Sequence, residues 1–274
     1  MSGTFYVIGT PIGNLEDITL RQLDTLAAVD FICAEDTRVT LKLLNRFDIK
    51  KPLVSFHEHS SKADAQKIID RLMAGESCGI VTDAGMPCIS DPGEVLVKMC
   101  AESGIDIKVV PGPSAVVSAI AVSGLSTRRF TFEGFLPVPK KERTQRLEKL
   151  RGETAIMVFY EAPHKLKTTL ADLAEFFGGD RRISLCRELT KIHEEVLRLT
   201  LAEAVEYYSI NEPRGEFVLV LEGAAECGGE SVTIDDALEQ VRKLIDMGEK
   251  PTEACKAVAK ETGFRKGELY SRLQ

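Results

Sequence analysis

Short apolar segments alternate with stretches of helical periodicity along the first 110 residues. The apolar segments are residues 5–8, 31–34, 53–56, 79–81 and 107–110. Buried parallel strands have this near-continuous apolar character, and crossover helices connect them. We therefore predict a mainly parallel sheet covered by helices on both faces, which is an α/β domain. Asp17 is expected to cap the helix that carries Leu20 and Leu23, and residues 62–73 are expected to form another helix.

The pattern changes after Gly112. A helix is expected over residues 114–122, and strands are expected over residues 130–135, 155–160, 183–186, 195–200 and 216–221. Only a short helical stretch separates the last two strands, which favours a mixed or antiparallel sheet. We predict an α/β domain over residues 1–113, an α+β domain over residues 114–225, a linker with Gly228 and Gly229, and a small helical extension of three helices over residues 231–274.

Composition limits the classes of function. The formal net charge is −7, so any contact with nucleic acid has to be local and not a coating of the whole surface. The seven cysteines form no C-x-x-C pair, and His57 and His59 have no cysteine near them, so no metal site is predicted. No run of 18 apolar residues and no leader peptide is present, so we expect a cytoplasmic protein without membrane association.

Three irregular loops are expected at one edge of the parallel sheet. They follow the first, fourth and fifth strands at residues 9–14, 82–93 and 111–115 and are rich in glycine and proline. The first loop lacks the G-x-G-x-x-G spacing of a dinucleotide-binding turn. Ligands of α/β proteins bind outside the carboxyl ends of the strands, so these loops predict a binding site rather than ordinary turns.

Short motifs in and beyond these loops resemble the ribosomal RNA small subunit methyltransferase I family. They are residues 9–15 (GTPIGNL), 34–38 (AEDTR), 55–59 (SFHEH), 82–87 (TDAGMP), 89–93 (ISDPG), 111–115 (PGPSA), 133–137 (EGFLP), 160–164 (YEAPH), 187–191 (RELTK) and 215–216 (GE). Porphyrin-precursor methylases, which share the wider class, typically have Gly-Asp-Pro where this chain has Gly85, Met86 and Pro87. The difference favours the RNA branch.

The resemblance implies a tetrapyrrole-methylase-like fold of two domains with S-adenosyl-L-methionine in the cleft between them, usually in a homodimer. It also implies 2′-O-methylation of a cytidine ribose in the decoding region of 16S ribosomal RNA, with the small ribosomal subunit as partner. The residues expected to bind the cofactor are Gly9, Pro11, Asp83, Gly85, Pro87, Ser114, Ala115, Tyr160 and Glu161.

The candidates for removing the proton of the 2′-hydroxyl are Lys191, Glu188 and Asp36. A buried lysine whose pKa is lowered can act as a base, and an arginine such as Arg38 can hold a phosphate beside the ribose. The alternative for Glu188 and Lys191 is a surface ion pair, because they lie three residues apart. His57, Glu58 and His59 are expected either to contact RNA or to form a hydrogen-bonded turn.

Residues 138–151 concentrate positive charge in an otherwise acidic chain. Lys140, Lys141, Arg143 and Arg146 are the predicted RNA-binding residues. The alternative is a solvated helix face with internal pairs such as Glu142 to Arg146. Two further functions remain open, namely a methyltransferase of a tetrapyrrole-like small molecule and a non-catalytic ribosome assembly factor.

Overall fold

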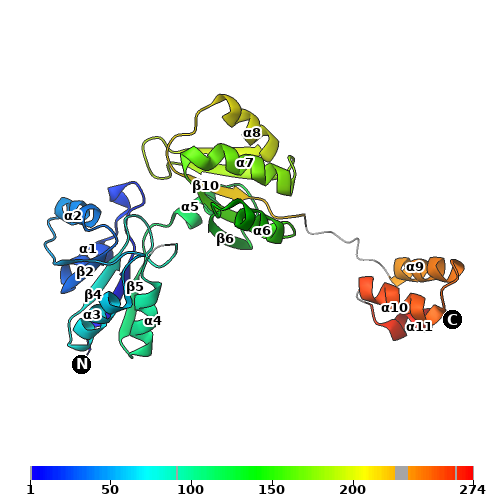
Figure 1. Cartoon of the computed structure of the whole chain (residues 1–274), viewed down its shortest axis with the longest axis horizontal. Helices are drawn as coiled ribbons and strands as arrows, with labels where there is room; N and C mark the ends of the chain where they lie inside the picture. The colour runs from blue at the N-terminus through cyan, green and yellow to red at the C-terminus, as the bar shows by residue number, and fades with distance from the viewer. Residues whose placement is uncertain (1, 91, 226–233, 263, 274) are drawn as a thin grey trace. The chain divides into compact units, whose positions relative to one another are not determined.

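The computed structural model describes residues 2–90, 92–225, 234–262 and 264–273. It divides into two compact units, residues 1–223 and 224–274, and both sheets lie in the first unit (Figure 1). The predicted division of the first unit near residue 113 stays a prediction. The predicted linker glycines Gly228 and Gly229 lie outside the described residues.

The first sheet is parallel, as the alternation of apolar and helical segments predicts. Its strands are β1 (Thr4–Ile8), β2 (Phe31–Ala34), β3 (Leu53–Ser55), β4 (Cys78–Val81) and β5 (Asp106–Val110), in the order β3-β2-β4-β1-β5. Because β1 lies between β4 and β5 and all three are parallel, the loops that follow these strands lie at the same end of the sheet.

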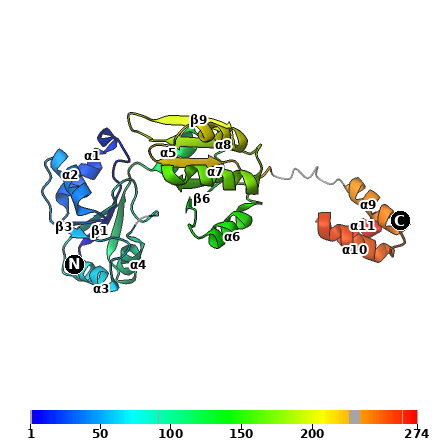
Figure 2. The same ribbon diagram turned by 45° about the horizontal axis from the view of Figure 1, so that its top comes forward.

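Helices cover both faces of this sheet (Figure 1 and Figure 2). Helices α3 (Lys62–Met73) and α4 (Glu94–Glu102) pack on one face around Phe5 and Phe31. Helices α1 (Leu20–Ala28) and α2 (Thr37–Arg46) pack on the other face around Ile8. Burial on both faces explains why β2 and β4 are buried along their whole length, whereas the edge strand β5 carries Asp106 and Lys108 and is mostly exposed.

The start of α1 differs in detail from the prediction. Asp17 ends the short 3-10 helix η1 (Leu15–Asp17), and Thr19 caps α1 by accepting a hydrogen bond from the backbone N–H of Gln22. The Gln22 side-chain oxygen in turn accepts a hydrogen bond from the backbone N–H of Thr19, a reciprocal pairing that the sequence pattern T-x-x-Q encodes. Ser114 occupies the N-cap position of α5 (Ala115–Val122), but its side chain makes no capping hydrogen bond.

The second sheet is mixed, as predicted. It contains β6 (Phe130–Phe135), β7 (Ile156–Glu161), β8 (Arg182–Arg187), β9 (Glu195–Thr200) and β10 (Phe217–Leu221), in the order β6-β7-β10-β8-β9. Only β6 and β7 are parallel. Helices α6 (Lys140–Leu150), α7 (Pro163–Phe177) and α8 (Leu201–Ile210) share a core on one face, and α5 packs on the other face.

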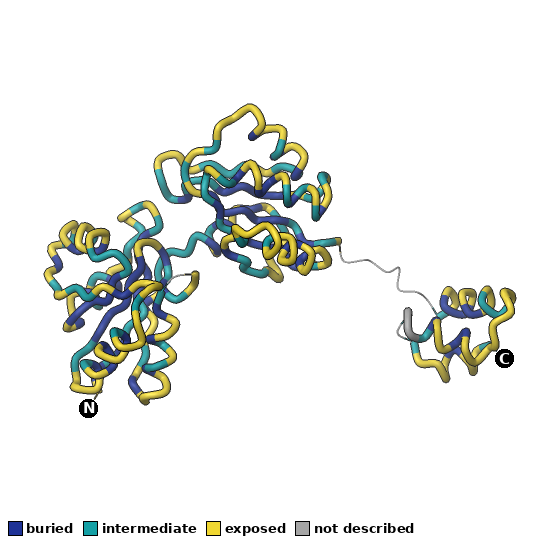
Figure 3. The backbone as a smooth tube through the Cα atoms, viewed as in Figure 1, coloured by how far each residue is buried: buried dark blue, intermediate teal, exposed yellow. Residues whose placement is uncertain are grey.

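The second unit contains the three predicted helices, α9 (Ile234–Asp246), α10 (Pro251–Thr262) and α11 (Lys266–Arg272). Leu238, Val241, Val258 and Leu269 form a core of its own, visible as a separate buried group in Figure 3. Within the described part of the chain, no helix is long and apolar enough to cross a membrane.

Candidate functional site

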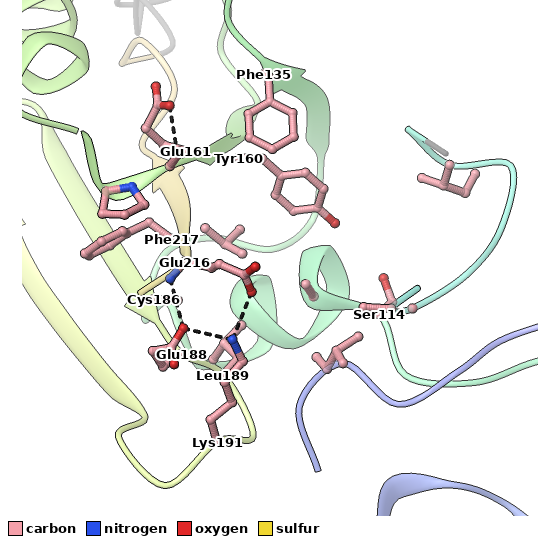
Figure 4. Close-up of a pocket in the computed structure, with 18 of the residues that line it drawn as sticks. Ser114, Phe135, Tyr160, Glu161, Cys186, Glu188, Leu189, Lys191, Glu216 and Phe217 are labelled. Carbon is pink, nitrogen blue, oxygen red and sulfur yellow. Dashed lines mark hydrogen bonds and ion pairs between the residues drawn. The ribbon is translucent and has the colours of Figure 1, made fainter. Parts of the chain in front are cut away.

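A cavity of about 430 Å³ lies within the first unit, between loops of the parallel sheet and strand ends of the mixed sheet. Gly85, Met86, Ser114 and Ala115 line it from the loops after β4 and β5. Tyr160 and other residues at the ends of β6, β7 and β8 and at the start of β10 line the opposite wall (Figure 4). The loops that the sequence singles out after β4 and β5 therefore meet the second sheet at one cavity.

Close backbone contacts hold these loops together. Thr10 and Gly85 exchange two backbone hydrogen bonds, of 2.8 and 3.1 Å, and Gly85 has a φ of +88°, where glycine is favoured. A Cβ on Gly9 would lie 2.8 Å from the Cα of Gly112, so only glycine fits between these loops. Of the residues predicted to bind the cofactor, Gly9, Pro11, Asp83 and Pro87 are not among those that line the cavity. Gly9 instead shapes the loops beneath it.

The structure does not support Asp36 as a base. Its carboxylate caps α2 and accepts hydrogen bonds from Arg38, at 3.0 Å from Nε and 2.6 Å from Nη2. These contacts lower the pKa of Asp36 to about 2, so it binds protons weakly. Neither residue lines the cavity. Asp83 accepts a 3.2 Å hydrogen bond from the backbone N–H of Asp36, and burial raises the pKa of Asp83.

Lys191 lies between two carboxylates at the cavity wall. Its Nζ is 2.9 Å from Oε1 of Glu188 and 2.9 Å from Oε2 of Glu216 (Figure 4). The backbone N–H of Glu216 also donates to Oε1 of Glu188 at 2.9 Å. Gly215 permits this approach, because a Cβ there would lie 2.5 Å from Cγ of Glu188. The ion pair expected as the alternative is therefore present, but it lines the cavity.

The expectation that the pKa of Lys191 is lowered is wrong. Burial works against its charge, but hydrogen bonds to Glu188 and Glu216 outweigh this effect, so the pKa of Lys191 is raised. The hydrogen bond from Lys191 lowers the pKa of Glu188. Lys191 is therefore an ammonium group at neutral pH and serves as a donor of hydrogen bonds.

Tyr160 and Glu161 have different orientations in the opposite wall. The Tyr160 ring lies 5.1 Å from the Phe132 ring and 5.6 Å from the Phe135 ring, which gives the cavity an aromatic side. The Glu161 carboxylate is buried and turns away from Lys191 (Figure 4). It accepts hydrogen bonds from the backbone N–H of Ala162 and from the Thr169 hydroxyl.

The basic segment forms α6, and its arginines are partly committed to protein contacts. Arg143 donates to Asp172 at 2.5 Å and to Thr169 at 2.8 Å, and Arg146 pairs with Glu133 instead of Glu142. Lys140 and Lys141 are exposed. This placement supports the two lysines as RNA contacts better than Arg143. After β3, His57 and Ser60 close a turn, with the His57 backbone N–H donating to the Ser60 hydroxyl at 2.9 Å.

Several cavity residues escaped the sequence prediction. Phe135, Met86, Ile12 and Glu216 line the cavity. Glu216 follows Gly215 in the motif of residues 215–216, and this motif was the feature of the sequence that could have identified Glu216 as a site residue. Ile12 and Met86 lie in two of the loops that the sequence singles out, and Phe135 ends β6, where the side-chain direction depends on the register of the second sheet. No metal-binding cluster of three histidine, cysteine or acidic side chains occurs among the residues with described positions.

The sequence matches the family described as Tetrapyrrole (Corrin/Porphyrin) Methylases over residues 4–205. Two relatives carry the name ribosomal RNA small subunit methyltransferase I. The relative from Bacillus subtilis (strain 168) is 43% identical over 275 residues, which cover 98% of this chain and 93% of the relative. The relative from Thermotoga maritima is 49% identical over 221 residues, which cover 81% of this chain and 99% of the relative.

Solved structures share the fold at low identity. The methyltransferase CobJ has a TM-score of 0.62 and is 19% identical, with 82% of this chain and 95% of that chain covered. Uroporphyrin-III C-methyltransferase from Thermus thermophilus, in complex with S-adenyl homocysteine, has a TM-score of 0.56 and is 15% identical. The match covers 80% of this chain and 97% of that one. Both comparisons confirm the predicted tetrapyrrole-methylase-like fold.

Proposed function

Because the chain belongs to the ribosomal RNA small subunit methyltransferase I family, within the tetrapyrrole methylases, we propose that it methylates 16S ribosomal RNA with S-adenosyl-L-methionine. The proposed acceptor is the 2′-hydroxyl of a cytidine in the decoding region of the small subunit. Relatives at 42–49% identity carry the ribosomal name, whereas the porphyrin and corrin methylases share only the fold, at 20% identity or less. This difference in sequence identity is the observation on which we propose RNA rather than a tetrapyrrole as the substrate.

The cavity suits a methyl donor of this kind. Its volume of about 430 Å³ falls in the range of small-molecule sites. Glu188 and Glu216 line it with a single lysine, so the lining has more negative than positive charge and favours a ligand with positive charge. Tyr160 and Phe135 offer ring faces against which a purine stacks. When bound, S-adenosyl-L-methionine supplies a methyl group on a positively charged sulfur.

Alignment of the acceptor is the main task left to the protein, because methyl transfer is an in-line displacement. We assign Lys191 to this task, as an ammonium that donates a hydrogen bond to the acceptor ribose or its phosphate. Glu188 holds Lys191 in place from the protein side. Glu216 is the more exposed carboxylate, with 82% side-chain exposure, and we assign to it the acceptance of the proton that the hydroxyl releases.

The binding of RNA is assigned to exposed positive charge outside the cavity. Lys140 and Lys141 on α6 are the proposed phosphate contacts, with Arg38 as a further candidate. A net charge of −7 restricts attraction to such local patches, which favours recognition of a folded subunit over a free strand. We also propose that the protein acts in the cytoplasm as a homodimer.

Methyl transfer to purified small ribosomal subunits that lack the modification tests this function. We expect label from S-adenosyl-L-methionine in the 16S RNA of subunits and little in a short naked oligonucleotide of the decoding sequence. Equal labelling of both would contradict recognition of the folded subunit. Label in a tetrapyrrole precursor and none in subunits at any assembly stage would contradict the RNA assignment.

A further inference from the structure

Three side chains connect the basic helix α6 to the cavity wall. Arg143 Nη2 on α6 donates to Thr169 Oγ1 on α7 at 2.8 Å. The Thr169 hydroxyl in turn donates to Oε2 of Glu161, at the end of β7. The other oxygen of Glu161 accepts from the backbone N–H of Ala162 at 2.9 Å.

The direction of these hydrogen bonds is fixed by the groups themselves. A guanidinium only donates and a carboxylate, when ionised, only accepts, so the Thr169 hydroxyl must accept from Arg143 and give its single proton to Glu161. Each bond polarises the next, which strengthens the chain in a buried setting. Asp172 holds Arg143 in position through a 2.5 Å hydrogen bond to Nε.

Burial makes this chain difficult to replace with water. Thr169 is 1% exposed and Glu161 is 4% exposed, and the Arg143 side chain is 14% exposed. Loss of the Thr169 hydroxyl would leave a buried carboxylate oxygen without its donor. An unsatisfied buried oxygen lowers the free energy of unfolding by more than the loss of an ordinary hydrogen bond does. The local backbone would then have to move to find another partner.

The segment that would move is part of the cavity. Tyr160, Glu161, Ala162 and Pro163 all line it, where β7 passes into α7. The Glu161 carboxylate points away from Lys191, and its hydrogen bond to Ala162 ties it to this backbone (Figure 4). Its contribution is therefore to hold the wall and the Tyr160 ring in place, rather than to contact the acceptor.

We propose that Arg143 is a positioning residue for the methyl-donor site, which acts through Thr169 and Glu161 on the wall formed by residues 160–163. This inference rests on the proposed function, because it takes the cavity as the donor site. It differs from the role that the sequence suggests for Arg143, which is contact with RNA phosphates. The positioning role predicts a rise in the KM for S-adenosyl-L-methionine, and the RNA-contact role predicts a rise in the KM for small subunits.

The test measures calorimetric binding of S-adenosylhomocysteine and the KM values for S-adenosyl-L-methionine and for small subunits, in the full-length protein. We expect Thr169→Val and Arg143→Met each to weaken binding of S-adenosylhomocysteine about tenfold and to raise the KM of S-adenosyl-L-methionine similarly. The KM for subunits should stay within about twofold. If Thr169→Val fails to fold, Arg143→Met still tests the inference, because it interrupts the same chain of hydrogen bonds at another residue.

Two control variants separate positioning from general damage. Thr169→Ser keeps the hydroxyl and should restore binding, and Thr168→Val makes the same change at an exposed site on the same helix and should leave binding unaltered. Unchanged affinity for S-adenosylhomocysteine in both Thr169→Val and Arg143→Met would overturn the inference. So would an increase confined to the KM for subunits in Arg143→Met. A folded wild-type protein without affinity for S-adenosylhomocysteine would overturn the proposed cofactor itself.

Discussion

The Nζ atom of Lys191 lies 2.9 Å from Oε1 of Glu188, and both residues line the cavity. Glu188 has a φ of +51°, a conformation that non-glycine residues seldom adopt. The same oxygen of Glu188 accepts from the backbone N–H of Glu216, so the carboxylate links Lys191 to the start of β10. This arrangement orients an ammonium group toward the cavity at the cost of an unusual backbone conformation.

Replacement of Lys191 by methionine should reduce methyl transfer strongly. Methionine keeps the length of the side chain but removes the hydrogen bonds that orient the acceptor, and we expect a fall in kcat on the order of 100-fold. Affinity for S-adenosylhomocysteine should change much less. Lys167→Met is the matched control, because Lys167 on α7 forms an exposed ion pair with Glu212. Equal activity of the two variants would remove Lys191 from the mechanism.

The pH dependence distinguishes an ammonium donor from a lysine base. The pKa of Lys191 is raised above 10.5, so its ionic contact is complete below that value and is lost only as pH rises through the raised pKa. The pKa of Glu188 is lowered below 4.5, so its contribution is present above that value and is lost as pH falls through the lowered pKa. Between these limits the pair stays ionised.

Single-turnover rates measured between about pH 6 and 9 should therefore show no step from the titration of Lys191. The comparison with Lys191→Met makes the test specific, because any step that belongs to another group persists in the variant. A step in the wild-type profile that disappears in Lys191→Met would show that Lys191 loses its proton in this range. The assignment as an ammonium donor would then fail.

Gly13 should tolerate no side chain. An added Cβ would lie 2.6 Å from Cγ of Lys191 and 2.8 Å from Oγ1 of Thr190. We expect Gly13→Ala to displace Lys191, to lower the methyl-transfer rate at least tenfold and to cost about 1–3 kcal/mol of the free energy of unfolding. Gly152→Ala is the control, because no atom lies within 4 Å of the Cβ that it would add. Normal transfer by Gly13→Ala would mean that the position of Lys191 has no influence on the rate.

Charge reversal at Lys140 and Lys141 should weaken binding to small subunits. The double variant Lys140→Glu, Lys141→Glu is expected to raise the KM for subunits more than tenfold at low salt and to leave the binding of S-adenosylhomocysteine unchanged. Lys50→Glu, Lys98→Glu changes the net charge equally at other exposed positions. If both double variants raise this KM to the same extent, the effect comes from net charge and not from a contact on α6.

Local sequence signals predict the order and type of the elements well. The apolar runs at β1 to β5 and the helix over residues 62–73 are set by periodicity alone, and the parallel arrangement follows from it. The start of α1 was misplaced at Asp17, because an acidic residue before a helix resembles a cap, whereas the reciprocal pair Thr19 and Gln22 performs that role.

The candidate site was less predictable, because its geometry depends on contacts between distant segments. Hydrogen bonds to Glu188 and to Glu216 raise the pKa of Lys191 against the effect of burial, and Glu216 is 25 residues away in the sequence and approaches only when β10 pairs with β8. Arg143 looks like its basic neighbours in sequence, and only the packing of α6 on α7 turns it toward Asp172 and Thr169. Sequence patterns indicate which residues have ionisable or hydrogen-bonding side chains. Tertiary contacts decide whether the pKa of such a side chain is raised or lowered and which partner it contacts.

The central claim is the transfer of a methyl group to a cytidine 2′-oxygen, and analysis of the reaction product tests it most directly. Small subunits would be labelled with S-adenosyl-L-methionine, and their 16S RNA digested to nucleosides and analysed by mass spectrometry. The account predicts labelled 2′-O-methylcytidine, and about 100-fold slower formation of this product when Lys191→Met replaces the wild-type protein under the same conditions. Label on a base, on a different nucleoside or on no RNA at all would contradict it.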